Sequence, residues 1–245
     1  MIKRKIRFTL ITKTVPEWSK RDKTLYTCSI GISPELGLIR LYPLPPTGME
    51  KYGVYELEVQ KNKRDCRSES WKITSYARHE EWTNFTDDIK YIGKSDEYNV
   101  GEYLKKYVSK SISDLNKNKK SIGVLCVDEF RADWDINNSF IDNSQIGLFA
   151  DVGEDVELAW HVDYTKNSKE KDLRIVFRDE DGLHNLQYNE WHYYEGQRLY
   201  GAKQNLLDPL NNKNRKLLLI GNMLQFQNNW MGLGKFIFNN QLTLL

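Results

Sequence analysis

The sequence predicts a mainly β fold with a few helices, arranged as two small β-barrels in tandem. Short segments that alternate apolar and polar residues, as strands with one buried face do, recur along the chain. Glycine and proline turn signals separate these segments. The length of 245 residues is enough for two small domains that each bury a core.

The first half contains four alternating segments that are predicted as strands: residues 2–13, 25–33, 38–42 and 52–61. The polar stretch after the first strand is predicted as a loop. Prolines at 43, 45 and 46 cannot donate to a β ladder, so the third strand must end or bend there. Apolar residues at helical spacing predict a helix over 100–114, and a short buried strand follows over 122–127.

The second half follows a polar stretch and is predicted to contain five strands: residues 156–164, 173–177, 183–188, 215–222 and 230–238. The turn "RDEDG" joins two of them as a hairpin, and Asn189 is the expected N-cap of a short helix. Each half therefore holds four or five strands and one helix. We expect two domains, residues 1–130 with the helix near 100–115 and residues 131–245. Small five-stranded barrels include the OB-fold, so both are predicted to be OB-like.

The composition and the missing motifs argue against several classes of protein. The three cysteines include no CxxC pair, which argues against a disulfide scaffold and a cysteine zinc site. No apolar segment reaches the length of a membrane span, so a cytoplasmic protein without membrane contact is expected. No P-loop, GxGxxG or GxSxG motif is present, so no cofactor is expected, and a binding protein is favoured over an enzyme. The net charge is only +2, but basic residues gather near the start, which indicates either an anionic partner or a solvated face.

Five segments in a fixed order resemble the bacterial dual OB-containing domain family. They begin with "KTVPEWS…TCSIGI…GLIRLYPLPP" and "KYGVYELEVQKNKRDCRSESWKI". They continue with "SIGVLCVDEFRADWDI", "FRDEDGLHNLQYNEW" and "LLLIGNMLQFQNNWMGLGKFIF". The resemblance spans nearly the whole chain and implies two OB-like barrels, a role near bacterial defence systems and nucleic-acid binding. The turn "RDEDG" lacks the cysteine pair of some relatives, so no metal site is carried over.

Two stretches of the first half are candidate ligand contacts. Arg40 and Tyr42 share one face of their strand, and they either hold a ligand or close the barrel end. An arginine can pair with phosphate, and a tyrosine can stack on a base. In "RDCRSESW", the side chains of Arg64, Arg67 and Ser70 could hold an anion beside Trp71. The alternative is a charged loop attached to the barrel.

Two stretches of the second half are further candidate sites. His184 and Glu190, near Asp179 and Asp181, could bind a divalent ion that drives phosphodiester hydrolysis. Their spacing matches no known metal motif, so a hairpin turn is the competing interpretation. The amide-rich stretch "MLQFQNNWMGLG" is either a base-reading loop or a hairpin loop over a barrel mouth.

The preferred hypothesis is a nucleic-acid-binding accessory or sensor module of a bacterial anti-phage defence system, with other defence proteins as further partners. Its predicted contacts are Arg40, Tyr42, Arg64, Arg67, Ser70 and Trp71. One alternative is a metal-dependent nuclease or nucleotide-acting enzyme that uses the His184 region, with His184 and Glu190 as its weak catalytic candidates. Another is a protein-interaction adaptor.

Overall fold

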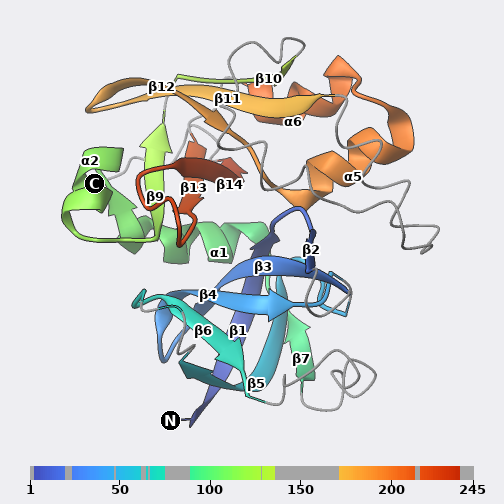
Figure 1. Ribbon diagram of the computed structural model, residues 1–245, viewed down its shortest axis with the longest axis vertical. Helices are drawn as coiled ribbons and strands as arrows, with labels where there is room; N and C mark the ends of the chain where they lie inside the picture. The colour runs from blue at the N-terminus through green and yellow to red at the C-terminus, as the bar shows by residue number, and fades with distance from the viewer. Residues whose placement is uncertain are drawn as a thin grey trace.

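The computed structural model describes residues 3–19, 24–46, 48–61, 65, 67–74, 89–127, 129–135, 171–212 and 216–237. Two β units lie one above the other in Figure 1, with the amino-terminal unit at the bottom. Arg64 and the predicted strand over 156–164 lie outside the described residues. Among the described helices, none has the length and apolar character needed to cross a bilayer.

The amino-terminal unit is a closed five-stranded barrel. Its strands are β1 (Lys3–Lys13), β3 (Thr24–Ser33), β4 (Gly37–Leu44), β5 (Gly53–Lys61) and β6 (Ser70–Ile73). The order around the barrel is β1-β3-β4-β6-β5, and β5 pairs with β1 to close it. The pairing of β4 with β6 is parallel, and the other pairings in the ring are antiparallel. The predicted OB-like barrel is confirmed.

Two short strands extend this barrel. β2 (Glu17–Ser19) pairs with β3, within the stretch that the sequence predicted as a loop. β7 (Lys90–Lys94) pairs with the start of β5. The prolines after β4 do end the strand near the predicted place, although Pro43 itself lies within β4 and follows a cis peptide bond.

The predicted helix over 100–114 is broken into several pieces. They are α1 (Glu97–Leu104), η2 (Lys105–Tyr107), β8 (Val108–Ser109) and α2 (Ile112–Lys117). The break lies at Val108, whose backbone is extended with φ −65° and ψ 124°. The side chain of Ser111 then accepts a hydrogen bond from the Asp114 amide and caps a new helix. Helical spacing alone could not locate this interruption.

The carboxy-terminal unit consists of two sheets and a helical segment. One sheet has the order β14-β13-β9-β8 and the other β10-β11-β12. The elements not yet introduced are β9 (Ile122–Val127), β10 (Phe130–Asp135), β11 (Asp172–Asp179), β12 (Gly182–Gln187), α5 (Trp191–Tyr200), η4 (Gln204–Leu207), α6 (Asp208–Asn211), β13 (Lys216–Asn222) and β14 (Trp230–Ile237). A bridge between Tyr188 and Gly232 links the sheets. β8 and β9 precede residue 130 but pair within this unit.

A small apolar cluster and three large apolar cores hold the described residues together. One large core fills the barrel, one fills the carboxy-terminal unit and the third lies between the two units. β13 serves two of them, because Leu218 and Ile220 enter the carboxy-terminal core while Leu217 and Leu219 enter the core between the units. All four side chains are fully buried. A strand covered on both faces explains the unbroken apolar run of its sequence.

Candidate functional site

The usual ligand face of an OB-fold is covered in this protein. OB-folds bind through the face of their second and third strands and through adjoining loops. Here those strands are β3 and β4, and their outward side chains Ile30, Ile32 and Leu38 are buried in the core between the units. Exposing these three side chains to water would cost roughly 4–9 kcal/mol. That cost is comparable to the whole stability of a typical domain, so the two units stay together.

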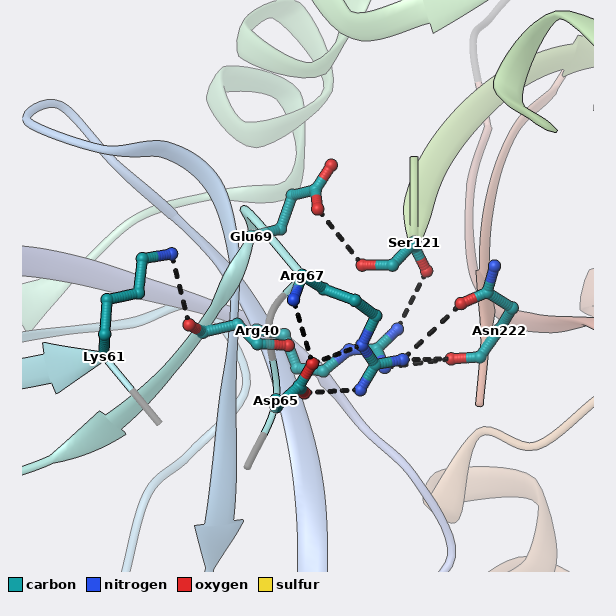
Figure 2. A network of polar contacts seen from close by, with 8 residues as sticks. Arg40, Lys61, Asp65, Arg67, Glu69, Ser121 and Asn222 are labelled. Carbon is teal, nitrogen blue, oxygen red and sulfur yellow. Dashed lines mark hydrogen bonds and ion pairs between the residues drawn. The ribbon is translucent and has the colours of Figure 1, made fainter. Parts of the chain in front are cut away.

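Arg40 lies on the same outward face of β4 and is directed into the contact between the units (Figure 2). Its Nη1 donates to the carbonyl oxygen of Asn222 at 2.9 Å, and its Nη2 donates to the carbonyl oxygen of Ser121 at 2.9 Å. The side chain is buried, and this burial lowers the pKa of the guanidinium from its ordinary value. Both terminal nitrogens are therefore committed to the carboxy-terminal unit and do not face a ligand.

Arg67, in the loop between β5 and β6, joins Arg40 at the same place. Its Nη1 donates to the Asn222 carbonyl oxygen at 3.0 Å. Its Nε and Nη2 form a two-pronged contact with the Asp65 carboxylate at 2.8 Å and 2.6 Å. Two guanidiniums thus converge on one backbone carbonyl. We call Arg40 and Arg67, with the carbonyl groups of Ser121 and Asn222, the arginine clamp.

The Asp65 carboxyl makes the clamp sensitive to acid. Burial opposes its ionisation, but hydrogen bonds from Arg67 outweigh that effect and lower the pKa of Asp65 from 3.8 to about 2. A carboxyl with a depressed pKa adds stability at pH values above its unfolded pKa and loses it as the pH falls through the folded pKa.

We therefore expect the free energy of unfolding of the wild type to exceed that of Asp65→Asn at about pH 5. The gap should narrow steadily towards about pH 2. Urea melts of both proteins across this range measure it. A gap of constant size would show that the ionised Asp65 carboxylate does not stabilise the fold.

Among the described residues, more cations than carboxylates lie around the loop between β5 and β6. Lys61 Nζ donates to the carbonyl oxygens of Ser68 and Ser70, and it lies 4.1 Å from the centre of the Trp71 ring. The guanidinium of Arg4 lies 5.8 Å from the same ring. Ser70 and Trp71 are both buried, so they support this loop from within.

On its other side the loop meets the carboxy-terminal unit through Glu69. Its carboxylate accepts a hydrogen bond from the Ser121 hydroxyl at 3.2 Å and lies 3.7 Å from Lys120 Nζ. The side chain of Lys120 is half exposed. The charged groups of this surface, which we call the cationic loop surface, are Arg4, Lys61, Arg67 and Lys120 with Asp65 and Glu69.

Tyr42 shares the outward face of β4 with Arg40, as their alternation predicted, but its surroundings differ. Its side chain is 37% exposed. The ring packs edge to face against Tyr26, with the ring centres 6.4 Å apart. The two residues of the predicted pair therefore have separate roles, because one is buried between the units and the other remains at the surface.

His184 and two carboxylates gather at the turn between β11 and β12. Ligand atoms of Asp179, Asp181 and His184 lie within 4.8 Å of one another, and His184 Nε2 lies 2.7 Å from Asp179 Oδ1. The carboxylates also accept hydrogen bonds from the first two amides of α2: Ile112 N to Asp179 at 3.0 Å and Ser113 N to Asp181 at 2.8 Å. A positive helix end already neutralises these groups, so we interpret the cluster as a helix cap.

Glu190 is not a member of the His184 cluster, and its carboxylate has partners of its own. Its Oε2 accepts a hydrogen bond from the Tyr188 hydroxyl at 2.6 Å, and its Oε1 pairs with Lys51 Nζ at 2.7 Å. A backbone bridge joins Glu190 to Thr14 at the end of β1. This buried carboxylate therefore fastens the barrel to the carboxy-terminal unit. It is also the N-cap residue of α5, one position after the predicted Asn189, although its side chain makes no capping hydrogen bond.

Sequence reasoning identified the arginines of the clamp but not their acceptors. Ser121 and Asn222 act through backbone carbonyl groups, which leave no mark on residue type. Asn222 lies directly before the amide-rich stretch in the sequence. Its side chain donates to the Gln227 carbonyl at 2.6 Å and so fixes the hairpin loop. Lys61 and Lys120 lie in the basic stretches "KNKR" (61–64) and "KNKK" (117–120), which are a usable signal in the sequence.

A protein-family model described as "Domain of unknown function (DUF8758)" matches residues 4–102. The match contains nearly all of the five-stranded barrel and ends within α1. It covers less than half of the chain, so the chain is similar to this family over its barrel. No curated protein matches the chain. The resemblance to the dual OB-containing domain family stays a prediction.

Proposed function

We propose that the protein binds nucleic acid through the cationic loop surface, as a cytoplasmic accessory or sensor module of a bacterial anti-phage defence system. The defence setting is supported by the family resemblance of the sequence segments. The observation that carries the binding proposal is the excess of cations around the β5–β6 loop. In an OB-fold, this loop is one of the segments that contact oligonucleotides.

The covered face limits how the ligand binds. A strand of nucleic acid cannot lie across β3 and β4 while Ile30 and Leu38 are buried beneath the second unit. It instead follows the rim, where Arg4 and Lys120 are exposed and can meet phosphates. Tyr42 supplies an exposed ring for stacking, an interaction worth about 1–3 kcal/mol per base. Phosphate contacts then dominate the affinity, which falls with salt.

Fluorescence anisotropy with labelled single- and double-stranded DNA and RNA tests this proposal. We expect binding at low salt, and a plot of log affinity against log salt concentration with a negative slope. Replacing both Arg4 and Lys120 by glutamate should reduce the magnitude of that slope by about one for each lost contact. The matched control reverses two exposed lysines elsewhere, Lys90 and Lys203, and should leave the slope unchanged.

The possible results distinguish binding at the cationic loop surface from a diffuse charge effect and from no binding. Absence of binding to all four nucleic acids at low salt would remove the proposal. If the control variant reduced the salt slope as much as the Arg4 and Lys120 variant, the effect would come from overall charge and not from contact at the β5–β6 loop. Comparison of Tyr42→Ala with Tyr42→Phe isolates stacking, because phenylalanine keeps the ring and should retain the affinity that alanine loses.

A further inference from the structure

A cleft of about 460 Å³ opens on the carboxy-terminal unit, away from the residues of the cationic loop surface. It lies between β8 and the end of β11. Ligand pockets in proteins have volumes of about 300–1,000 Å³, so the cleft is large enough for a small ligand or a short chain segment. Val108, Ser109 and the partly buried thiol of Cys126 line one side of it.

This side of the cleft is the edge of a sheet. β8 is the last strand in the order β14-β13-β9-β8, and within the described part of the chain no strand pairs with its other side. Val108 is 37% exposed at this edge. The Val108 amide already donates to the Lys105 carbonyl, so only the remaining backbone groups of this short edge can pair with an extended peptide, while the cleft beside it selects the side chains.

The charges of the cleft favour a ligand that carries both signs. Lys110 and Arg178 supply cations, and Glu129, Asp179 and Glu180 supply carboxylates. Arg178 Nε lies 3.2 Å from the Glu129 carboxylate, so a cation and a carboxylate lie side by side in the cleft. A chain of phosphates would meet these carboxylates at close range and be repelled. A peptide with one basic and one acidic side chain would find a partner for each.

We propose that this cleft binds a short extended peptide that carries both a basic and an acidic side chain. The peptide pairs with the edge of β8 and covers the thiol of Cys126. The site is independent of the nucleic-acid proposal, because the two surfaces share no residue. It would allow the protein to hold a segment of another protein while the cationic loop surface remains open.

Alkylation of Cys126 by iodoacetamide, followed by mass spectrometry of the peptide that contains it, reports on occupation of the cleft. The probes are two pools of tripeptides, Lys-X-Glu and Glu-X-Lys with apolar X. Each pool is made once with blocked ends and once with free ends. AMP serves as the phosphate probe. At saturation we expect a blocked pool to slow the alkylation at least about threefold, which corresponds to occupation of most of the sites.

Protection by the blocked pools supports recognition of a segment inside a partner protein, whereas protection by the free pools alone supports a free peptide. The variants Lys110→Glu and Glu180→Lys should each abolish protection. Lys119→Glu, an exposed charge reversal outside the cleft, should not. Unchanged alkylation with every peptide pool, or equal protection by AMP, would overturn the proposal.

Discussion

Replacing Arg40 by alanine is expected to lower the free energy of unfolding by about 2–4 kcal/mol. The substitution leaves the Ser121 carbonyl with only the Asn222 amide as its donor, and it removes one of the two guanidinium donors to the Asn222 carbonyl. It also removes a buried positive charge that acts on Asp65 and Glu69. Chemical denaturation of the purified variant measures the loss.

The variant Arg40→Lys keeps the positive charge and tests whether the forked shape of the guanidinium is needed. One ammonium group cannot reproduce a planar fork that reaches two carbonyl oxygens, so Arg40→Lys should lose about 1–2 kcal/mol. Arg7 is an exposed arginine on β1 and serves as the matched control, with an expected change within about 0.5 kcal/mol. If Arg40→Ala were as mild as Arg7→Ala, the guanidinium would have to lie in solvent, and the clamp would not exist.

Leu219→Ala is expected to destabilise the protein by about 2–5 kcal/mol, as much as Leu218→Ala. The two leucines are neighbours on β13 and face opposite ways, so each is the control for the other. Leu218 enters the core of the carboxy-terminal unit, and Leu219 enters the core between the units. Both are fully buried.

Equal effects at these two positions require the barrel to cover the outer face of β13. If that face lay in solvent, Leu219→Ala would change the unfolding free energy by only about 0.5 kcal/mol, as surface substitutions do. Both variants should also unfold in a single transition. Separate transitions for the barrel and the carboxy-terminal unit would contradict a shared core.

The sequence predicted four of the five barrel strands because their alternating pattern depends on local chemistry, but it did not predict the short β6. β1 alternates from Lys5 to Leu10, and β9 is a short apolar run that the structure places at the predicted residues. β10 was missed although it alternates strictly, with Ala132 and Trp134 buried and Arg131 paired with Asp133 at the surface. The polar residues that follow Asp135 make the whole stretch resemble a linker between the two halves.

The role of Arg40 could be predicted only in part. Alternation placed it correctly on the outward face of β4 with Tyr42. Its hydrogen-bond acceptors lie 81 and 182 residues further along the chain, so no local pattern could show that this face is covered. The same limit applies to Glu190, whose partner Lys51 is 139 residues away. Contacts between units decide which polar residues remain open to a ligand.

The burial of the OB ligand face is the central claim, and cysteine labelling tests it most directly. Leu38 and Tyr42 lie on the same outward face of β4, the first 7% exposed and the second 37% exposed. Single cysteines are introduced at each position in a chain whose own three cysteines are replaced by serine. Labelling with a thiol reagent is then followed under native conditions. We expect Tyr42→Cys to react rapidly and Leu38→Cys to react only at the rate of global unfolding. Rapid labelling of Leu38→Cys in the folded protein would contradict the covered face.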